Sequence, residues 1–407
     1  MRFPVRRPAG RLCLLLLCLG LFACAGARPP PPPGPERAPE LSLRPVSFDQ
    51  LQGWERDRPG EALEAFRRSC GALMQKPDDR EVGPQPIFGR FGDWRPACVA
   101  AGQEAAPVSA ERARLFFETW FLPYLVSDGG NPFGLFTGYY EPLLYGSRHY
   151  GAPYTVPLYR SPADLVRIDL GRFNPALAGY SIAGRIVGDQ FVPYYSRAEI
   201  EAGALSGRGL ELLWVDSPID KFFLQIQGSG QVRLDDGRLV RIGYAGQNGQ
   251  PYRAIGRDLV EIGALTPDEV SLQSIRSWLQ AHPEDATTIM DRNRSYVFFE
   301  ERAELDPNDG PLGTEGVSLT PGRSLAVDLR YLPLGAPVWL DTTAPWPEGE
   351  APLRRLMVAQ DSGGAIKGVV RGDVFWGAGA RAEAIAGRMK SQGRYAVLLP
   401  RTLAPTS

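Results

Sequence analysis

Each of three aspartates toward the end of the chain has its carboxyl group among apolar residues or glycines. Asp361 precedes Ser-Gly-Gly-Ala-Ile-Lys, Asp373 precedes Val-Phe-Trp-Gly, and Asp328 follows Leu-Ala-Val. Burying a carboxylate is costly unless it is paired, and burial raises the pKa of the carboxyl group. A carboxyl group that keeps its proton near neutral pH can act as a general acid, which cleavage of a glycosidic bond requires. This region is therefore the first candidate for a reactive site.

Other kinds of chemistry find little support in the composition. The chain has only two histidines, His149 and His282, and neither lies near other candidate ligands in the sequence. A zinc site or a Ser-His-Asp triad therefore has little to build on, and we expect no metal and no other cofactor. The formal net charge of -1 favours neither nucleic acid nor an anionic bilayer as a partner. The chemistry is expected to come from carboxylates.

The first residues have the pattern of a targeting segment. A basic start is followed by an apolar run from Leu12 to Cys24, which is shorter than the roughly 20 apolar residues of a transmembrane helix. We interpret residues 1–23 as a signal peptide. The sequence Leu21-Phe-Ala-Cys24 resembles a lipoprotein cleavage box and predicts lipidation of Cys24. Because Ala25 follows, the anchor is expected at the periplasmic face of the outer membrane. The alternatives are ordinary cleavage near Ala23 or Ala25, which would give a soluble periplasmic protein, and an uncleaved anchor.

A proline-rich tether is expected next, over residues 24–46, because such a segment is extended and packs no core. The remaining length suits two domains. Cys70 and Cys98 are left as an even pair once the signal and the lipidated cysteine are set aside. In an oxidising compartment they can form a disulfide, and two buried free thiols are the alternative.

The chain after the tether changes from helical to β character. Apolar residues recur at helical spacing over Phe48–Trp54, Pro59–Gln75 and Ser109–Leu125, and again over residues 253–280. From Leu135 onward, short alternating runs between Gly and Pro turns predict many strands, which suggests a barrel. Predicted strands include Ile182–Ile186, Leu212–Val215, Phe222–Gln227, Gln231–Leu234, Leu239–Tyr244, Ser324–Asp328, Leu356–Gln360, Val369–Phe375 and Tyr395–Leu399.

Several long motifs then identify a family. The segments Phe136-Thr-Gly-Tyr-Tyr-Glu-Pro142, Pro193 to Ile200, Trp214 to Gly230 and Tyr244 to Tyr252, together with the three-aspartate region, resemble the membrane-bound lytic murein transglycosylase A family. The resemblance runs from about residue 60 to residue 400 and implies a mainly β fold with a helical N-terminal part. It further implies a double-psi β-barrel domain, built from residues 47–142 and 286–407, with a second β-domain inserted at 143–285.

The same resemblance implies a reaction and its partners. Members of the family cleave the β-1,4 bond between N-acetylmuramic acid and N-acetylglucosamine, and the muramic C6 hydroxyl attacks C1 to leave a 1,6-anhydro ring. The expected partners are glycan strands of peptidoglycan, the outer membrane through the lipid, and proteins of cell-wall synthesis or remodelling. Two other classes remain: a carbohydrate-binding protein without catalysis and a structural envelope lipoprotein.

The resemblance also assigns unequal roles to the three aspartates. Asp373 matches the family's catalytic acid, which donates a proton and afterwards accepts one. Asp361 is the alternative acid and is otherwise expected to support Asp373, by fixing its loop or accepting a sugar hydroxyl. Asp328 is expected to orient its neighbours through hydrogen bonds. The alternative from the residues alone is that all three cap turns. Lys367 is expected to point to Asp361 or to the glycan, since pairing with Asp373 would lower the pKa of the acid; a plain surface position is its alternative.

Substrate contacts are expected from three further segments. The first contains Thr137, Tyr139, Tyr140 and Glu141, whose aromatic faces and polar groups suit sugar rings, although one tyrosine of the two could equally lie in a core. The second contains Gln225, Gln227 and Ser229. Together with Gln231 they occupy every second position of a predicted strand, so their side chains share one face. Tyr244 and Gln247 form the third. A polar sheet face exposed only to solvent is the alternative for the last two segments.

Overall fold

The computed structural model describes residues 38–177, 180–302 and 309–403, so Cys24, the signal segment and the first part of the tether lie outside the described residues. Within these ranges no helix is both long and apolar enough to cross a membrane. The described chain is mostly β, with a group of helices near its start, as the sequence predicts. Two larger sheets and one three-stranded sheet account for its strands.

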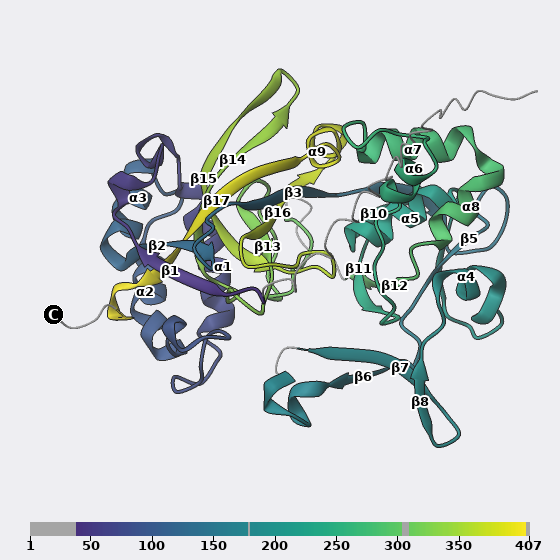
Figure 1. Cartoon of the computed structure of the whole chain (residues 1–407), viewed down its shortest axis with the longest axis horizontal. Helices are drawn as coiled ribbons and strands as arrows, with labels where there is room; N and C mark the ends of the chain where they lie inside the picture. The colour runs from purple at the N-terminus through teal and green to yellow at the C-terminus, as the bar shows by residue number, and fades with distance from the viewer. Residues whose placement is uncertain (1–37, 178–179, 303–308, 404–407) are drawn as a thin grey trace, which may run out of the picture. The chain divides into compact units, whose positions relative to one another are not determined.

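Six strands close into a barrel in the order β17-β14-β15-β13-β16-β3, because β17 pairs with β14 on one side and with β3 on the other. The pairs β13–β15 and β16–β3 are parallel, and the other pairs of the ring are antiparallel. Figure 1 shows β3 among the strands that come from the end of the chain. The strands span Gly134–Glu141 (β3), Ser324–Val327 (β13), Pro337–Trp346 (β14), Gly349–Asp361 (β15), Arg371–Ala378 (β16) and Lys390–Pro400 (β17).

Two strands and three helices from the start of the chain extend the barrel. Strands β1 (Leu41–Pro45) and β2 (Phe121–Asp128) form an antiparallel pair, and β2 continues the sheet at the end of β17. The helices are α1 (Gly60–Leu73), α2 (Phe91–Gln103) and α3 (Ala110–Trp120), and a short helix α9 (Ala380–Ala386) lies between β16 and β17. The sulfur atoms of Cys70 in α1 and Cys98 in α2 are 2.13 Å apart, joined as a disulfide.

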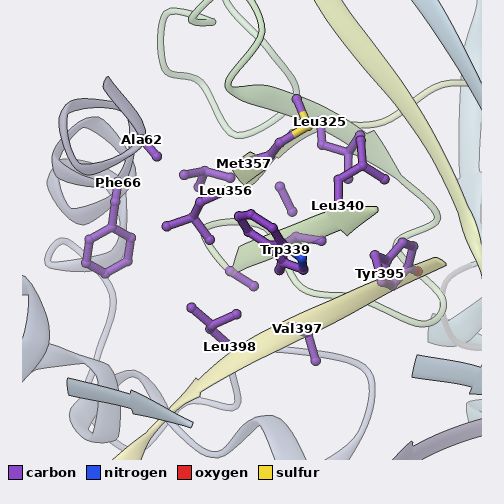
Figure 2. Close-up of a cluster of buried hydrophobic side chains, with 14 of the residues drawn as sticks. Ala62, Phe66, Leu325, Trp339, Leu340, Leu356, Met357, Tyr395, Val397 and Leu398 are labelled. Carbon is purple, nitrogen blue, oxygen red and sulfur yellow. The ribbon is translucent and has the colours of Figure 1, made fainter. Parts of the chain in front are cut away.

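The main core lies between α1 and the barrel strands. Ala62 and Phe66 of α1 and Trp339, Leu356 and Leu398 of the barrel are almost completely buried (Figure 2). Burying one such Leu or Phe side chain stabilises the fold by roughly 1.5–3 kcal/mol. Helix α1 is therefore packed against one side of the barrel through almost completely buried side chains.

The chain between β3 and β13 forms a second sheet in the order β12-β11-β10-β4-β9-β5. Its strands are β4 (Leu143–Ser147), β5 (Val156–Tyr159), β9 (Glu211–Val215), β10 (Gly230–Leu234), β11 (Leu239–Gln247) and β12 (Val297–Arg302). The predicted hairpin at Asp235-Asp-Gly237 is confirmed, with Gly237 at φ 85° between β10 and β11. Strand β12 lies beyond residue 285, where the sequence analysis ended the insertion; the domain division itself stays a prediction.

A three-stranded antiparallel sheet and five helices complete this part of the chain. The strands are β6 (Val166–Asp169), β7 (Ser181–Val187) and β8 (Gln190–Pro193). The helices are α4 (Arg197–Glu199), α5 (Pro218–Gln227), α6 (Gly256–Glu261), α7 (Leu272–Ala281) and α8 (Pro283–Asp291).

Two predictions of secondary structure are wrong. The segment Phe222–Gln227 belongs to helix α5, which begins with Pro218 after a Ser217 cap and ends at Gly228 with φ 83°. These start and stop signals outweigh the β propensity of the aromatic residues. The third predicted helix ends at Trp120, because Pro123 cannot donate the backbone hydrogen bond that a helix interior needs, and strand β2 takes over.

Candidate active site

The barrel brings two of the three aspartates into one row across its strands. Ala326 of β13 pairs with Asp361 of β15 on one side and with Asp373 of β16 on the other. Asp373 in turn pairs with Thr137 of β3. Directly paired residues point to the same face of a sheet, so both carboxyl groups project on one side, with the small Ala326 side chain between them. Strands lie about 4.8 Å apart, so the two backbone positions are separated by roughly 10 Å.

Asp373 is half-buried and is held by hydroxyl and guanidinium groups. The Thr137 hydroxyl donates to Asp373 Oδ1 at 2.6 Å, and Thr137 Oγ1 accepts from Arg371 Nη2 at 2.8 Å. Burial raises the pKa of the Asp373 carboxyl above its usual range, and the charge of Asp361 adds to this. The Arg371 charge and the Thr137 hydrogen bond lower it, but they do not cancel the effect of burial. Asp373 is therefore suited to hold a proton while one face remains accessible.

Asp361 ends strand β15 and has three donors. The Tyr139 hydroxyl donates to Oδ2 at 2.8 Å, and Oδ1 accepts from the backbone N–H and the hydroxyl of Thr314 at 2.9 and 2.8 Å. Burial raises the pKa of the Asp361 carboxyl despite these hydrogen bonds. Burial, followed by the charge of Asp361, also raises the pKa of Tyr139 well above its ordinary value, so the phenol stays a donor.

Asp328 follows β13 and is buried in a different environment. Arg330 donates to both of its oxygens, from Nε at 3.0 Å and Nη2 at 2.5 Å, and the Gly368 N–H donates to Oδ2 at 2.8 Å. Burial alone would raise the pKa of Asp328, but the hydrogen bonds from Arg330 and Gly368 outweigh it and leave the pKa below its usual range. Asp328 is thus an ionised, paired carboxylate that holds the Gly368 backbone.

The barrel and its neighbouring sheet match known proteins in sequence and structure. A family model described as the MltA specific insert domain matches residues 135–300, and one described as the 3D domain matches residues 323–399. A membrane-bound lytic murein transglycosylase of Agrobacterium tumefaciens superposes with a TM-score of 0.77 at 34% identity, covering 89% of this chain and 99% of that one. The chain belongs to the MltA family.

Two further relatives extend the MltA comparison. Membrane-bound lytic murein transglycosylase A of Vibrio cholerae is 37% identical over 204 residues, which are 49% of this chain and 54% of the relative; the chain thus spans about half the length of that protein. The Escherichia coli protein of the same name is 32% identical over 280 residues, 67% of each chain. A crystal structure of E. coli MltA with bound chitohexaose superposes with a TM-score of 0.62 at 26% identity, covering 88% of this chain and 94% of that one.

The remaining residues of the β3 motif divide between the site and the interior of this MltA chain. Thr137 and Tyr139 contact the two aspartates, as described above. Tyr140 is buried, and burial, followed by the charge of Glu383, raises the pKa of its phenol. Glu141 is buried as well; Arg241 donates to it at 2.8 Å and Gln231 at 2.9 Å. Burial raises the pKa of the Glu141 carboxyl, although Arg241 opposes this. Tyr140 and Glu141 are therefore buried, and their contact with substrate stays a prediction.

The prediction that Gln225, Gln227, Ser229 and Gln231 share one strand face is wrong, because the first two lie on helix α5 and Gln231 on strand β10. Gln225 is buried, donates to the Val297 carbonyl and accepts from Arg197. Gln227 accepts from the Tyr140 N–H at 3.0 Å. Ser229 is half-buried in the turn between α5 and β10.

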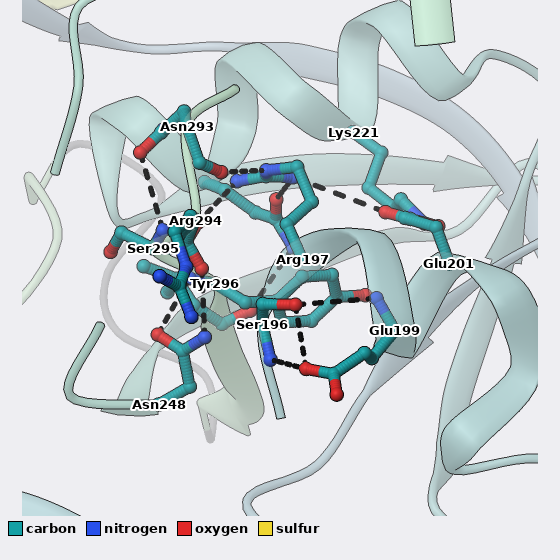
Figure 3. A network of polar contacts seen from close by, with 12 residues as sticks. Ser196, Arg197, Glu199, Glu201, Lys221, Asn248, Asn293, Arg294, Ser295 and Tyr296 are labelled. Atoms are coloured by element: carbon teal, nitrogen blue, oxygen red, sulfur yellow. Dashed lines mark hydrogen bonds and ion pairs between the residues drawn. The ribbon is translucent and has the colours of Figure 1, made fainter. Parts of the chain in front are cut away.

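Gln225 belongs to a network around a buried arginine. Arg197 donates to the carbonyls of Asn293 and Ser295, at 2.9 and 2.7 Å (Figure 3). Lys221, also buried, donates to Glu201 at 2.6 Å. The two buried cations, Arg197 and Lys221, thus have carbonyl, amide or carboxylate acceptors, which is the condition for burying charge without a large penalty. This network joins helices α4 and α5 to the segment that leads into β12 and encloses Gln225, whose contact with a glycan stays a prediction.

The other predicted contacts lie at the surface. Tyr244 of β11 is 42% exposed and its hydroxyl accepts from Arg167 at 3.4 Å. Gln247, at the end of the same strand, lies beside the loop after Asp361: its Oε1 would be 3.6 Å from a Cβ placed on Gly364. Lys367 is exposed, and no ion pair of its ammonium group is found within the described ranges.

Sequence reasoning missed three residues near the aspartates. Arg371 donates a hydrogen bond to Thr137, and the Thr314 hydroxyl donates one to Asp361. The third residue is Tyr252: burial, followed by the charge of Asp373, raises the pKa of its phenol. The signal for Arg371 was its place two residues before Asp373, which puts both on one face of a strand. Within the described residues no group of His, Cys, Asp and Glu has the arrangement of a metal site.

Proposed function

We propose that this protein is a peptidoglycan lytic transglycosylase, which cleaves the β-1,4 bond between N-acetylmuramic acid and N-acetylglucosamine and leaves 1,6-anhydromuramic ends. The observation that carries the proposal is the pair Asp361 and Asp373 on one barrel face, with the pKa of both carboxyl groups raised, in a member of the MltA family. The names of the relatives and the chitohexaose bound to one of them support a β-1,4-linked glycan as substrate.

Asp373 acts as both acid and base. Its protonated carboxyl donates to the glycosidic oxygen, and the N-acetylglucosamine side leaves with that proton. The resulting carboxylate then takes the proton from the muramic C6 hydroxyl as this oxygen bonds to C1, so the carboxyl group is regenerated. One side chain suffices because the nucleophile is part of the substrate, and two carboxylates placed for water attack are not required. The attack is intramolecular, so holding the sugar correctly supplies much of the rate.

The neighbours of Asp373 decide which oxygen carries the proton. Thr137 Oγ1 already accepts from Arg371, and its hydroxyl hydrogen is directed to Asp373 Oδ1. Oδ1 is thus an acceptor fixed by the protein, which leaves Oδ2 to exchange the proton with substrate. Asp361 supports the acid in two ways: its charge helps to raise the pKa of Asp373, and it fixes the Tyr139 hydroxyl. Asp328 orients the Gly368 backbone.

The finer architecture belongs to the same proposal. The closed six-stranded ring with two parallel pairs supports a double-psi β-barrel formed by residues 47–142 and 286–407, with a second domain inserted over 143–285. Pairing of β12 with β11 argues for carrying the inserted domain on to about residue 302. Gln247, Tyr244 and Lys367 are accessible to a glycan at the barrel face, whereas Gln225 is not.

The membrane-bound names of the relatives support attachment to a membrane, and a lipid on Cys24 is the proposed means. The outer membrane is the proposed location. Replacing Cys24 by Ser tests this: the protein should then be recovered in the soluble periplasmic fraction, and persistence in the membrane fraction would contradict the anchor.

The activity is tested by incubating the purified protein with peptidoglycan sacculi and measuring the masses of the released fragments. Muropeptides one water lighter than hydrolysis products are expected. Fragments with hydrated reducing ends would contradict the proposal and show that the protein is a hydrolase. Binding without release would favour a carbohydrate-binding protein, the alternative suggested by the barrel shape.

A further inference from the structure

A cavity of about 660 Å³ lies on the barrel, and none of the three aspartates lines it. It is formed by the segment that leads into α1, the start of α3 and the first half of β15. Arg355 of β15 precedes Asp361 by six residues, which is roughly 20 Å along a strand. The charged residues of the lining are Arg56, Asp57, Arg58, Glu61, Arg323, Arg354 and Arg355.

The two carboxylates of the cavity are already used by one arginine. Arg323 is buried and donates to Asp57 at 3.0 Å, to Glu61 at 3.2 Å and to the carbonyls of Leu356 and Arg58. Asp57 also accepts from the backbone N–H groups of Leu356 and Arg58, both at 2.8 Å. Arg323 and its acids thus form one hydrogen-bonded structural unit, and the charges of Asp57 and Glu61 also act on Arg355.

The other arginines of the cavity differ in whether they form an ion pair. Arg354 is paired with Asp341 and Arg56 with Glu55. Within the described ranges, by contrast, neither Arg58 nor Arg355 forms an ion pair. Arg355 has one long hydrogen bond, 3.4 Å to the Gly322 carbonyl, and lies 5.9 Å from the Trp346 ring centre. Burial, followed by the charge of Arg323, lowers the pKa of Arg355, and the charges of Asp57 and Glu61 offset this only in part.

Backbone donors add to this positive surface. Gly60 and Glu61, the first residues of the 14-residue helix α1, line the cavity. Pro59 occupies the N-cap position and provides no side-chain hydrogen bond to the first turn. The first amides of a helix have no intrahelical acceptor and carry the positive end of the helix dipole, so they favour an anion.

We propose that this cavity binds a phosphate group, held by Arg355 and Arg58 and by the first amides of α1. Guanidinium groups bind phosphate oxygens in pairs of parallel hydrogen bonds, and two arginines that form no ion pair within the described ranges supply two positive charges for a phosphate dianion. The volume of the cavity exceeds that of phosphate itself, so there is room for the group that bears it. That group is either a small soluble molecule or the headgroup of an anionic lipid.

Calorimetric titration of the purified protein with inorganic pyrophosphate tests the site. We expect saturable binding, and a loss of about tenfold in affinity for Arg355→Gln and for Arg58→Gln, the scale of one charge-assisted hydrogen-bonded contact. Arg58 is exposed, so its replacement should leave the melting temperature unchanged. Arg148→Gln is the matched control, because Arg148 is paired with Glu301 and does not line the cavity. Absence of binding, or an equal loss in Arg148→Gln, would overturn the proposal.

Sedimentation with vesicles distinguishes the two sources of phosphate. If the protein sediments with phosphatidylglycerol vesicles but not with phosphatidylcholine, and Arg355→Gln abolishes this, the site takes a lipid headgroup. If pyrophosphate binds and neither vesicle does, the ligand is a soluble phosphate compound. Cleavage of sacculi by Arg355→Gln should equal that of the unmodified protein, so the outcome is independent of the proposed function.

Discussion

Asp328 and Asp373 lie at neighbouring strands of one barrel, yet the protein holds their carboxyl groups in opposite ways. Arg330 donates to both oxygens of Asp328, whereas Asp373 receives one hydroxyl hydrogen from Thr137 and has the charge of Asp361 nearby. The pKa of Asp328 is therefore lowered and that of Asp373 raised. Burial of an acid does not by itself mark a reactive group; what matters is whether its partners compensate the charge.

Asp328 and Asp373 also contribute to folding stability with opposite dependence on pH. The pKa of Asp328 is lower in the folded chain than in the unfolded one, so its contribution to stability is present above the unfolded pKa and is lost as pH falls through the folded pKa. Asp373 has a raised folded pKa, so its contribution is present below the unfolded value and is lost as pH rises through the folded pKa. At neutral pH the reactive acid reduces the stability of the fold, and the structural acid supports it.

The largest effect on cleavage is expected from Asp373→Asn. An amide cannot donate and then recover the proton, so release of muropeptides should fall by about 10³-fold, within the range for general acid catalysis. The melting temperature at neutral pH should stay the same or rise, because the cost of ionising a partly buried carboxyl group is removed. Mass analysis of sacculus digests and a thermal melt check both points. If folded Asp373→Asn still released muropeptides at a substantial rate, the catalytic acid would have to be Asp361 instead.

Asp361→Asn is expected to reduce the release of muropeptides less, by about tenfold, which is the scale of one misplaced charge-assisted contact. The change frees the Tyr139 and Thr314 donors and removes a charge that raises the pKa of Asp373. Because Asp373 must be protonated, activity is lost as pH rises through its pKa, and this limb of the rate profile should move to lower pH. A limb that stays in place would show that Asp361 does not act on Asp373.

Arg371→Gln should move the same limb in the other direction. The Arg371 charge lowers the pKa of Asp373, so its removal raises that pKa and extends activity to higher pH. The rate at the optimum should fall by a few-fold, because Thr137 loses the donor that directs its hydroxyl. The pH profiles of Asp361→Asn and Arg371→Gln, measured together, should diverge; parallel shifts would contradict the assigned electrostatics.

The smallest effect on cleavage is expected from Asp328→Asn, whose main consequence is for stability. Arg330 loses its ion pair, which should cost roughly 1–3 kcal/mol of unfolding free energy at neutral pH. The loss should diminish in acid, where Asp328 itself becomes protonated. Denaturant unfolding at two pH values measures this, and cleavage per folded molecule should change by less than about twofold on the same argument. A large fall in that specific rate would place Asp328 in the chemistry.

Local signals were enough to predict much of this fold. Alternation and turns predicted the barrel strands and the hairpin at Gly237, because each depends on neighbouring residues. Helix α5 was missed because Phe222 and Phe223 favour strands, while the signals that decided it, Pro218 and Gly228, lie at its ends. In this segment the residues at the helix ends outweigh the strand propensity of the two aromatic residues.

The site could be predicted only in part, since its geometry depends on contacts between distant residues. The aspartates are visible in the sequence, but the pairing of Ala326 with both Asp361 and Asp373 follows from barrel closure. The hydrogen bond from Arg371 to Thr137 joins residues 234 positions apart, and no local pattern indicates it. The burial of Tyr140 and Glu141 likewise depends on helices and strands that arrive later in the chain.

The most direct test of the contrast between the two acids is a carboxyl-carbon NMR titration of protein labelled with ¹³C at its aspartates. The Asp373 and Asp328 signals are assigned by their loss in Asp373→Asn and Asp328→Asn. The account predicts that Asp373 titrates above the ordinary aspartate range and Asp328 below it. If Asp373 titrated at or below that range, it could not hold the proton that cleavage requires, and the assignment of the acid would be wrong.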